Sequence, residues 1–350
     1  MNRLESLDFL RGWAAVLVVI SHLVGVFWAG QPGLQKLMGY QSIGSVALPY
    51  ADWIVKNKLL FGQLGVAIFF ILSGFVITRS LERFKSWGFL INRAIRIYPV
   101  YISGFCVLIL GLYLVDFEGD GIPYTYQHLL IHSLIIVRQW FGYTRIDGIS
   151  WTLEIELYFY VIMFSLFQLS ENINLLGVLV VFFISALITS LRCKIGWYES
   201  RQIMMVGYML LGYFFYMLIN SKIHKCYFFT LIISELAVVF SFFNNTKPFA
   251  LDVWGWFIGY LLAPFIFGLA LLIFCEKRID PFSKFLANIS YPLYVSHAIF
   301  GYSLLVCFLK SGCNEWFSLT AVMVCIVLTA YLIHFYIEKP SIQLSRKFNH

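Results

Sequence analysis

The chain has 350 residues, of which 60% are hydrophobic and only 12% are charged, and its mean hydropathy is +0.81. Soluble domains carry about 25% charged residues, so the composition excludes an ordinary soluble domain and predicts an all-α, polytopic membrane protein. The net charge of +7 does not indicate nucleic-acid binding, because the basic residues lie between apolar runs and suit loops at an anionic membrane leaflet. Without a sequence repeat or a long linker, residues 1–350 are expected to form one domain.

A membrane-spanning helix needs about 20 mostly apolar residues. The runs that qualify predict about ten spans, at 9–29, 63–79, 97–115, 150–169, 174–191, 203–220, 227–243, 254–275, 291–309 and 316–337. Segment 45–60 is expected to be a loop with an amphipathic piece. Segment 127–140 is expected to lie at the interface or to re-enter the membrane. This topology places 15 of the 25 Lys and Arg residues on one side, so both termini are predicted to be cytoplasmic.

The first run keeps two costly polar side chains, Arg11 and His22. They are eleven residues apart, so they share one helix face and lie about 16 Å apart along the axis. Asp8 is expected to pair with Arg11 near the inner surface, while His22 lies deep in the membrane. An ionisable group at that depth indicates a functional site. The alternatives are a snorkelling anchor for Arg11 and a helix–helix hydrogen bond for His22.

The second run ends as FFILSGFVITRS, and a basic loop follows it. Ser73 and Gly74 predict close helix packing. Arg93 and Arg96, three residues apart, project from one side of a helix, and guanidinium groups suit phosphate oxygens. The simpler interpretation of this loop is a charge run that sets the topology.

Two further blocks carry candidate site residues. In SWTLEIELYFY the residues Glu154 and Glu156 point about 200° apart, so one at most faces a given cavity, and the other is expected to pair with an Arg or to cap a helix. Trp151 is an interface aromatic or a sugar-stacking surface. In NISYPLYVSHAIF, Pro292 is expected near a helix start, with Tyr291 beside it. His297 is either a second catalytic or donor-orienting group or a structural contact.

No metal site is predicted. His128 and His132 have a spacing that can bind zinc, but no carboxylate completes a motif, and an interfacial position explains both. The cysteines are scattered singly. Cys193 and Cys313 could both face the outside, and the sequence leaves their pairing open.

In this order the blocks resemble the acyltransferase-3 family of bacterial inner-membrane proteins, which includes O-antigen, lipopolysaccharide, exopolysaccharide and Nod-factor O-acetyltransferases. The matching residues are Arg11 and His22; Phe69, Phe70, Ser73 and Gly74; Arg93, Arg96 and Pro99; Ser150, Trp151 and Glu154; and Ser290, Tyr291, Leu293, Tyr294 and His297. The resemblance covers nearly the whole chain. It implies ten spans and transfer of an acyl group from cytoplasmic acyl-CoA to a sugar hydroxyl. The SGNH domain that follows in some members is not expected here.

The resemblance and the residues together predict a mechanism. His22 is expected to be the base or to carry the acyl group itself, and Glu154 to orient His22 or to hold the acceptor. Arg11, Arg93 and Arg96, with Ser73 nearby, would bind acetyl-CoA as a co-substrate rather than a permanent cofactor. The other expected partners are a glycan or lipid-linked oligosaccharide and membrane lipids. The alternatives are a transporter or acyl-group flippase, and a structural or sensory protein.

Overall fold

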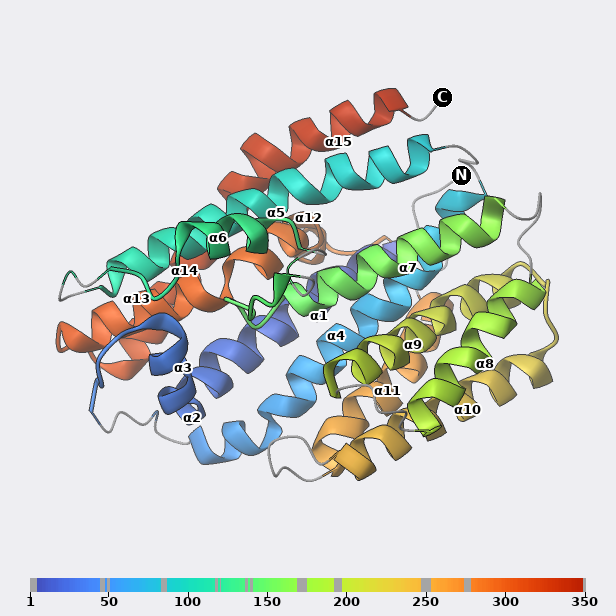
Figure 1. The fold of residues 1–350 in the computed structure, drawn as a ribbon, viewed down its shortest axis with the longest axis horizontal. Helices are drawn as coiled ribbons and strands as arrows, with labels where there is room; N and C mark the ends of the chain where they lie inside the picture. Colours follow the sequence, from blue (N-terminus) through green and yellow to red (C-terminus); the bar gives the residue numbers. More distant parts are fainter. Residues whose placement is uncertain are drawn as a thin grey trace.

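A computed structural model describes the chain over residues 5–44, 48, 51–82, 87–116, 119, 121–135, 138, 141–168, 175–191, 197–246, 253–273 and 278–348. Every regular element in these residues is helical (Figure 1). The helices are α1 (Glu5–Ile20), α2 (Phe27–Ala29), α3 (Gln31–Met38), α4 (Ala51–Leu81), α5 (Gly88–Leu114), α6 (Tyr126–Ser133), α7 (Ser150–Gln168), α8 (Leu175–Leu191), α9 (Trp197–Ile219), α10 (Lys225–Thr246), α11 (Val253–Ile273), α12 (Pro281–Ser296), α13 (Ala298–Lys310), α14 (Glu315–Ile333) and α15 (Lys339–Ser345). Two π-helical segments, Ser21–Val26 and His334–Glu338, join α1 to α2 and α14 to α15.

The ten predicted spans all fall on helices of the structure. Seven helices in the described residues are long and apolar enough to cross a membrane, and the pair α12 and α13 passes the same test as one bent span. The remaining two predicted spans correspond to the shorter apolar helices Gly177–Thr189 and Phe257–Ile273. A polytopic helical membrane protein with about ten spans is therefore consistent with the structure.

Two sequence predictions about local structure are wrong. Of segment 45–60, expected to be a loop with an amphipathic piece, residues 51–60 belong to helix α4, which begins at Ala51, while 45–47 and 49–50 lie outside the described residues. Pro292 lies inside α12, because that helix begins eleven residues earlier, at Pro281, where the Asp280 side chain accepts a hydrogen bond from the Ser283 amide. An N-cap followed by proline is a strong start signal, and it outweighs the signal from the second proline.

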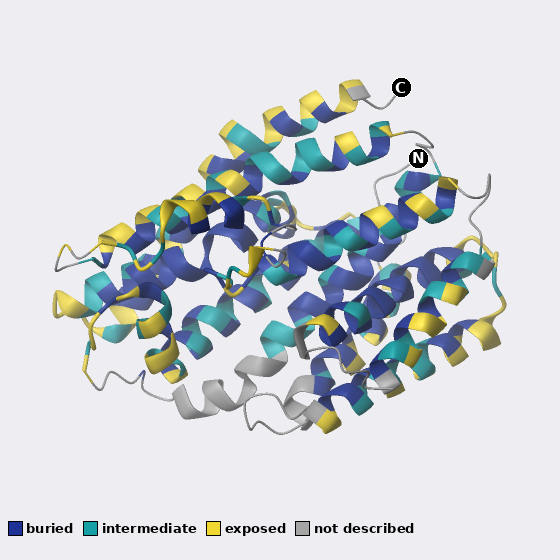
Figure 2. Cartoon of the chain, in the orientation of Figure 1, coloured by how far each residue is buried: buried dark blue, intermediate teal, exposed yellow. Residues whose placement is uncertain are grey.

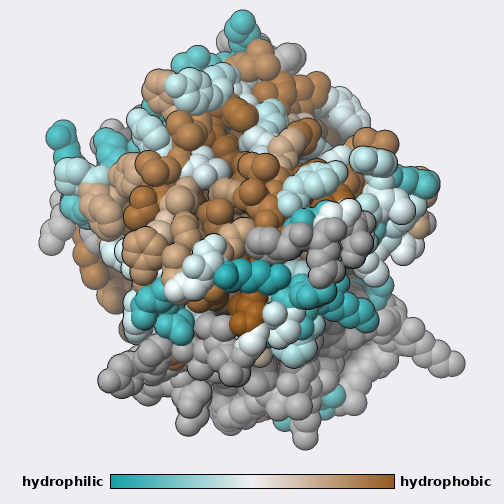
Figure 3. All heavy atoms as spheres, turned by 90° about the vertical axis from the view of Figure 1, so that its left-hand side faces the viewer, coloured by the Kyte–Doolittle hydropathy of each residue, from teal (hydrophilic) through white to brown (hydrophobic). Residues whose placement is uncertain are grey.

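The apolar surface supports a lipid environment. Large hydrophobic side chains are exposed on the outer faces of several helices, among them Ile102, Leu110, Phe183, Leu187, Phe229, Ile233, Leu328 and Leu332. The interior of the bundle is buried along the central helices (Figure 2). At the end of the bundle that carries α3 and the α13–α14 turn, hydrophobic side chains gather above a band of hydrophilic ones (Figure 3).

Helix α1 lies at the centre of the site-forming part of the bundle, packed against α4 and α12. Close packing of α4 with α9 confirms the prediction for the Ser73–Gly74 step. A Cβ atom added at Gly74 would overlap the backbone oxygen of Met209, and one at Gly212 would overlap that of Ile71. The two glycines therefore bring the α4 and α9 backbones together, which fixes the position of α4 along the cavity described next.

Candidate active site

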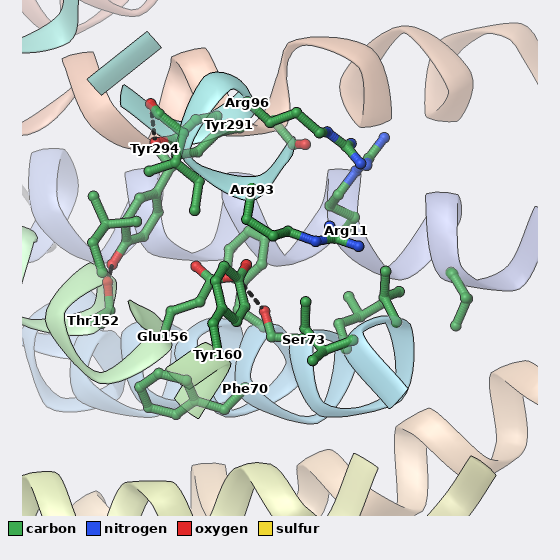
Figure 4. Close-up of a pocket in the computed structure, with 18 of the residues that line it drawn as sticks. Arg11, Phe70, Ser73, Arg93, Arg96, Thr152, Glu156, Tyr160, Tyr291 and Tyr294 are labelled. Atoms are coloured by element: carbon green, nitrogen blue, oxygen red, sulfur yellow. Dashed lines mark hydrogen bonds between the residues drawn. The ribbon is translucent and has the colours of Figure 1, made fainter. Parts of the chain in front are cut away.

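A cavity of about 310 Å³ lies between α1, α4, α5, α7 and α12, and residues near the end of the chain also line it (Figure 4). One end, here called the arginine end, carries Arg11, Arg79, Arg93 and Arg96. The opposite end, here called the deep end, is formed by Val66, Phe69, Phe70, Thr152, Leu153 and Tyr294. Val66 and Arg79 are 13 residues apart on α4, so the cavity extends for about 20 Å along this helix.

The arginines that the sequence singled out do come together. Arg93 is buried, donates to Ser80 Oγ at 2.6 Å, and stacks over the rings of Phe89 and Tyr160 at 5.3 and 5.9 Å. Arg96 lines the same cavity. Arg11 donates to Asp8 Oδ1 at 3.3 Å, as predicted, and to the backbone oxygen of Ala287 at 2.9 Å. Guanidinium groups clustered at one end of a cavity form a site suited to phosphate groups.

Of the two glutamates on α7, Glu156 lines the cavity and Glu154 does not. Glu156 Oε1 accepts hydrogen bonds from Ser73 Oγ at 2.8 Å and from the Tyr160 hydroxyl. The predicted geometry, with one glutamate at the cavity and the other paired with Arg, is therefore present, but the cavity residue is Glu156 and not Glu154, which was the predicted site residue. Tyr160 one helical turn beyond Glu156 was the signal that could have identified it.

Glu154 is buried in a polar cluster beyond the cavity. It pairs with Arg138, accepts from Arg145 Nη2 at 2.8 Å and accepts from Gln202 Nε2 at 3.1 Å. Arg138 is fully buried and also donates to Ser150 Oγ at 3.1 Å. These contacts satisfy the carboxylate without His22, so the cluster ties the start of α7 to α9 and to the segment before α7.

His22 faces another histidine across the bundle. Its Nδ1 lies 2.9 Å from Nε2 of His297, and the two rings stack at 4.9 Å. His22 is half-buried and lies in the π-helical segment, a type of insertion that is frequent at functional sites. His297 is fully buried at the break between α12 and α13, where the helix axis bends by 73°. Because Arg11 and His22 both contact the α12 region, the predicted shared face of α1 is present.

The hydrogen bonds of His297 fix which nitrogen carries the proton in both rings. His297 Nδ1 lies 2.8 Å from the backbone oxygen of Tyr294 and 3.1 Å from that of Leu293. Carbonyl oxygens only accept, so Nδ1 donates, and Nε2 of neutral His297 is left as an acceptor. His22 Nδ1 must then donate to it, which leaves the lone pair on Nε2 of His22. This is the tautomer that a general base needs.

Tyr294 connects the cavity to the histidine pair. Neither histidine lines the cavity, whereas the Tyr294 ring does. Its hydroxyl is 2.7 Å from Thr152 Oγ1, its ring packs edge-on against Phe69 at 5.5 Å, and its backbone oxygen accepts from His297. The deep end of the cavity is thus one side chain away from the imidazoles.

The sequence matches the model of the acyltransferase domain family over residues 4–335. The chain belongs to the acyltransferase-3 family. The chain is 29% identical over 193 residues to Nodulation protein 10 of Rhizobium leguminosarum bv. viciae. It is 26% identical over 215 residues to an O-acetyl transferase of Shigella phage Sf6, and 29% identical over 164 residues to acyltransferase MdmB of Streptomyces mycarofaciens. These alignments cover 51%, 58% and 45% of this chain and 48%, 56% and 38% of the relatives, or about half of each. No solved structure matches the chain.

The matched family is one of acyltransferase domains, and the remaining candidate residues can be placed around the cavity. Tyr291 lines the cavity and donates to the backbone oxygen of Ile97 at 3.0 Å. The Trp151 ring lies 4.1 Å from the Arg201 guanidinium and packs against Phe70. The indole ring therefore packs behind the deep end, against a side chain that lines the cavity.

The side chains of His128 and His132, which the sequence predicted to lie at the membrane interface, are both buried within the protein. His132 Nε2 accepts from the amide of Ile146 at 3.1 Å and from Arg138 at 3.3 Å. The pKa of His132 is lowered to about 4, mainly by burial, with Arg138 and Arg145 acting in the same direction and Asp147 opposing them. Within the described residues, no group of three or more His, Cys, Asp and Glu side chains is placed to hold a metal ion. Cys313 is a free thiol, and Cys193 lies outside the described residues.

Proposed function

We propose that this protein is an O-acyltransferase that moves an acyl group, acetyl in the simplest case, from acyl-CoA to a hydroxyl of a cell-surface glycan or its lipid-linked precursor, such as O-antigen, lipopolysaccharide or exopolysaccharide. The observation that carries the proposal is the tautomer that His297 imposes on His22. A base with its lone pair fixed on Nε2 is what a sugar hydroxyl needs in order to attack a thioester. The O-acetyl transferase of Shigella phage Sf6 supports the same class of reaction.

The donor enters at the arginine end in this proposal. Arg11, Arg93 and Arg96 bind the phosphates of coenzyme A, and the thin pantetheine arm follows the roughly 20 Å of the cavity along α4 towards Tyr294. The excess of basic residues on the side where α1 begins supports a cytoplasmic location for this end, and therefore entry of the donor from the cytoplasmic side of a bacterial inner membrane.

The reaction then balances as a direct acyl transfer. His22 Nε2 takes the proton of the acceptor hydroxyl while that oxygen forms a bond to the thioester carbonyl carbon. The tetrahedral intermediate collapses by breaking the carbon–sulfur bond, and the imidazolium returns the proton to the leaving thiolate. His297 acts as a positioning residue, because it holds the His22 ring and stabilises the positive charge that forms there.

Two variants separate the roles of the two ends. His22→Ala should abolish release of free CoA thiol in the presence of glycan while binding of acetyl-CoA survives. Arg93→Gln should retain turnover at saturation and raise the KM for acetyl-CoA about tenfold or more, since a charge-assisted contact is worth about 1.5–3 kcal/mol. Thiol release by purified protein, together with mass spectrometry of surface polysaccharides, measures both effects. Normal acylation by His22→Ala would refute the assignment of the base.

A further inference from the structure

The charges that line the cavity are distributed unevenly along it. All four of its arginines lie at the arginine end, where Asp8 and Glu338 are also found. The described side chains that form the deep end, from Val66 to Tyr294, carry no charge. Between the two ends lies Glu156, whose partner Ser73 is seven residues from Val66 and six from Arg79 on α4. A ligand that extends from the arginines to the deep end must therefore pass a carboxylate halfway.

The structure holds this carboxylate in a fixed position. Ser73 and Tyr160 both donate to Oε1 of Glu156, so the side chain is anchored from α4 and from one turn further along α7. Both hydrogen bonds fall on Oε1, and the charges of Arg93 and Arg96 act on the carboxylate from the arginine end, while Glu156 itself lines the cavity. In Figure 4 its carboxylate lies between Thr152 and Tyr294 on one side and Arg11 and Arg93 on the other.

We propose that Glu156 is a specificity residue that restricts the donor to thioesters whose acyl group is uncharged. The inference rests on the proposed function, in which the coenzyme A phosphates occupy the arginine end. An acetyl group then passes Glu156 as a neutral group and enters an apolar end lined by Phe69 and Phe70. A succinyl group brings a second carboxylate past Glu156 into a region where the described lining offers no cation to compensate it.

Two effects act together against the charged acyl group. Like charges several ångströms apart in a protein interior repel each other strongly enough to change affinity roughly tenfold to a hundredfold. A carboxylate that enters an apolar pocket without a partner also loses its hydration. Discrimination by such a repulsive element is a general route to specificity. Acetyl-CoA is therefore expected to bind at least about tenfold more tightly than succinyl-CoA.

Calorimetric titration of the purified protein in detergent tests the inference without knowledge of the acceptor. The probes are coenzyme A, acetyl-CoA and succinyl-CoA. In Glu156→Gln the amide can still accept from Ser73 and Tyr160, but the charge is gone. The ratio of the succinyl-CoA to the acetyl-CoA dissociation constant should fall to within about threefold of unity, mainly through tighter binding of succinyl-CoA, while acetyl-CoA affinity is retained and shows that the variant is folded.

Glu338→Gln is the matched control, because it removes a cavity carboxylate at the arginine end. It should leave the ratio of the two thioesters unchanged. Equal dissociation constants in the unaltered protein, an unchanged ratio in Glu156→Gln, or an equal loss of discrimination in Glu338→Gln would each overturn the assignment to Glu156 and leave the proposed function standing. Failure of the folded, unaltered protein to bind any of the three probes would overturn the proposed donor, and this inference with it.

Discussion

The pairing of His22 with His297 yields a prediction that two similar substitutions can separate. In His297→Asn the side-chain amide can replace Nδ1 as donor to the backbone oxygens of Leu293 and Tyr294, but no atom extends towards His22. In His297→Gln the longer side chain places its amide near the position of Nε2, where its oxygen can accept from His22 Nδ1. The two variants thus keep opposite halves of the hydrogen bonding that the structure shows.

The expected magnitude follows from the single hydrogen bond of 2.9 Å that His297→Asn removes. A buried donor left without an acceptor costs about 1–3 kcal/mol. If the His22 tautomer required for catalysis becomes less stable by this free energy, the rate drops about 5- to 150-fold, since each 1.36 kcal/mol is a factor of ten. His297→Gln restores the acceptor, so its rate should stay within about fivefold of the unaltered protein.

Steady-state release of CoA thiol, with acetyl-CoA varied at a fixed glycan concentration, measures this difference. Because His297 does not line the cavity, the loss in His297→Asn should appear in kcat, with the KM for acetyl-CoA unchanged. Equal rates for His297→Asn and the unaltered protein would refute the proposed role of the second imidazole. So would a rise in KM with kcat intact, because that pattern would place His297 in donor binding instead.

The remaining predictions concern stability. Gly74→Ala should lower the melting temperature, because its Cβ would overlap the backbone oxygen of Met209 and overpacking costs about 1–3 kcal/mol. Gly33→Ala is the control, because a Cβ there meets nothing within 4 Å, and its effect on stability should be neutral or slightly favourable. For His132, burial lowers the pKa from 6.5 to about 4, so the unfolded chain binds a proton that the folded state does not. Stability should therefore fall by up to about 3 kcal/mol as the pH drops from 6.5 to 4, and melting curves of His132→Gln should lack this contribution. An identical pH dependence in that variant would contradict the buried, neutral state of His132.

The sequence by itself was sufficient for the architecture and for the family. Apolar runs of membrane length locate the spans because a helix that crosses a bilayer must satisfy its own backbone hydrogen bonds. Helical periodicity also predicted the pairing of Asp8 with Arg11 and the shared face of Arg11 and His22. These are local properties, and they depend only on residues within one helix.

Only the tertiary structure decided which side chains meet across helices. The choice between Glu154 and Glu156 depends on where α4 and the segment before α7 lie around α7, and no periodicity within α7 encodes that. The same holds for the contact of His22 with His297, which are 275 residues apart and meet because α1 packs along α12. A sequence can place a polar residue on a helix face, but its chemistry is set by the partner that packing brings to that face.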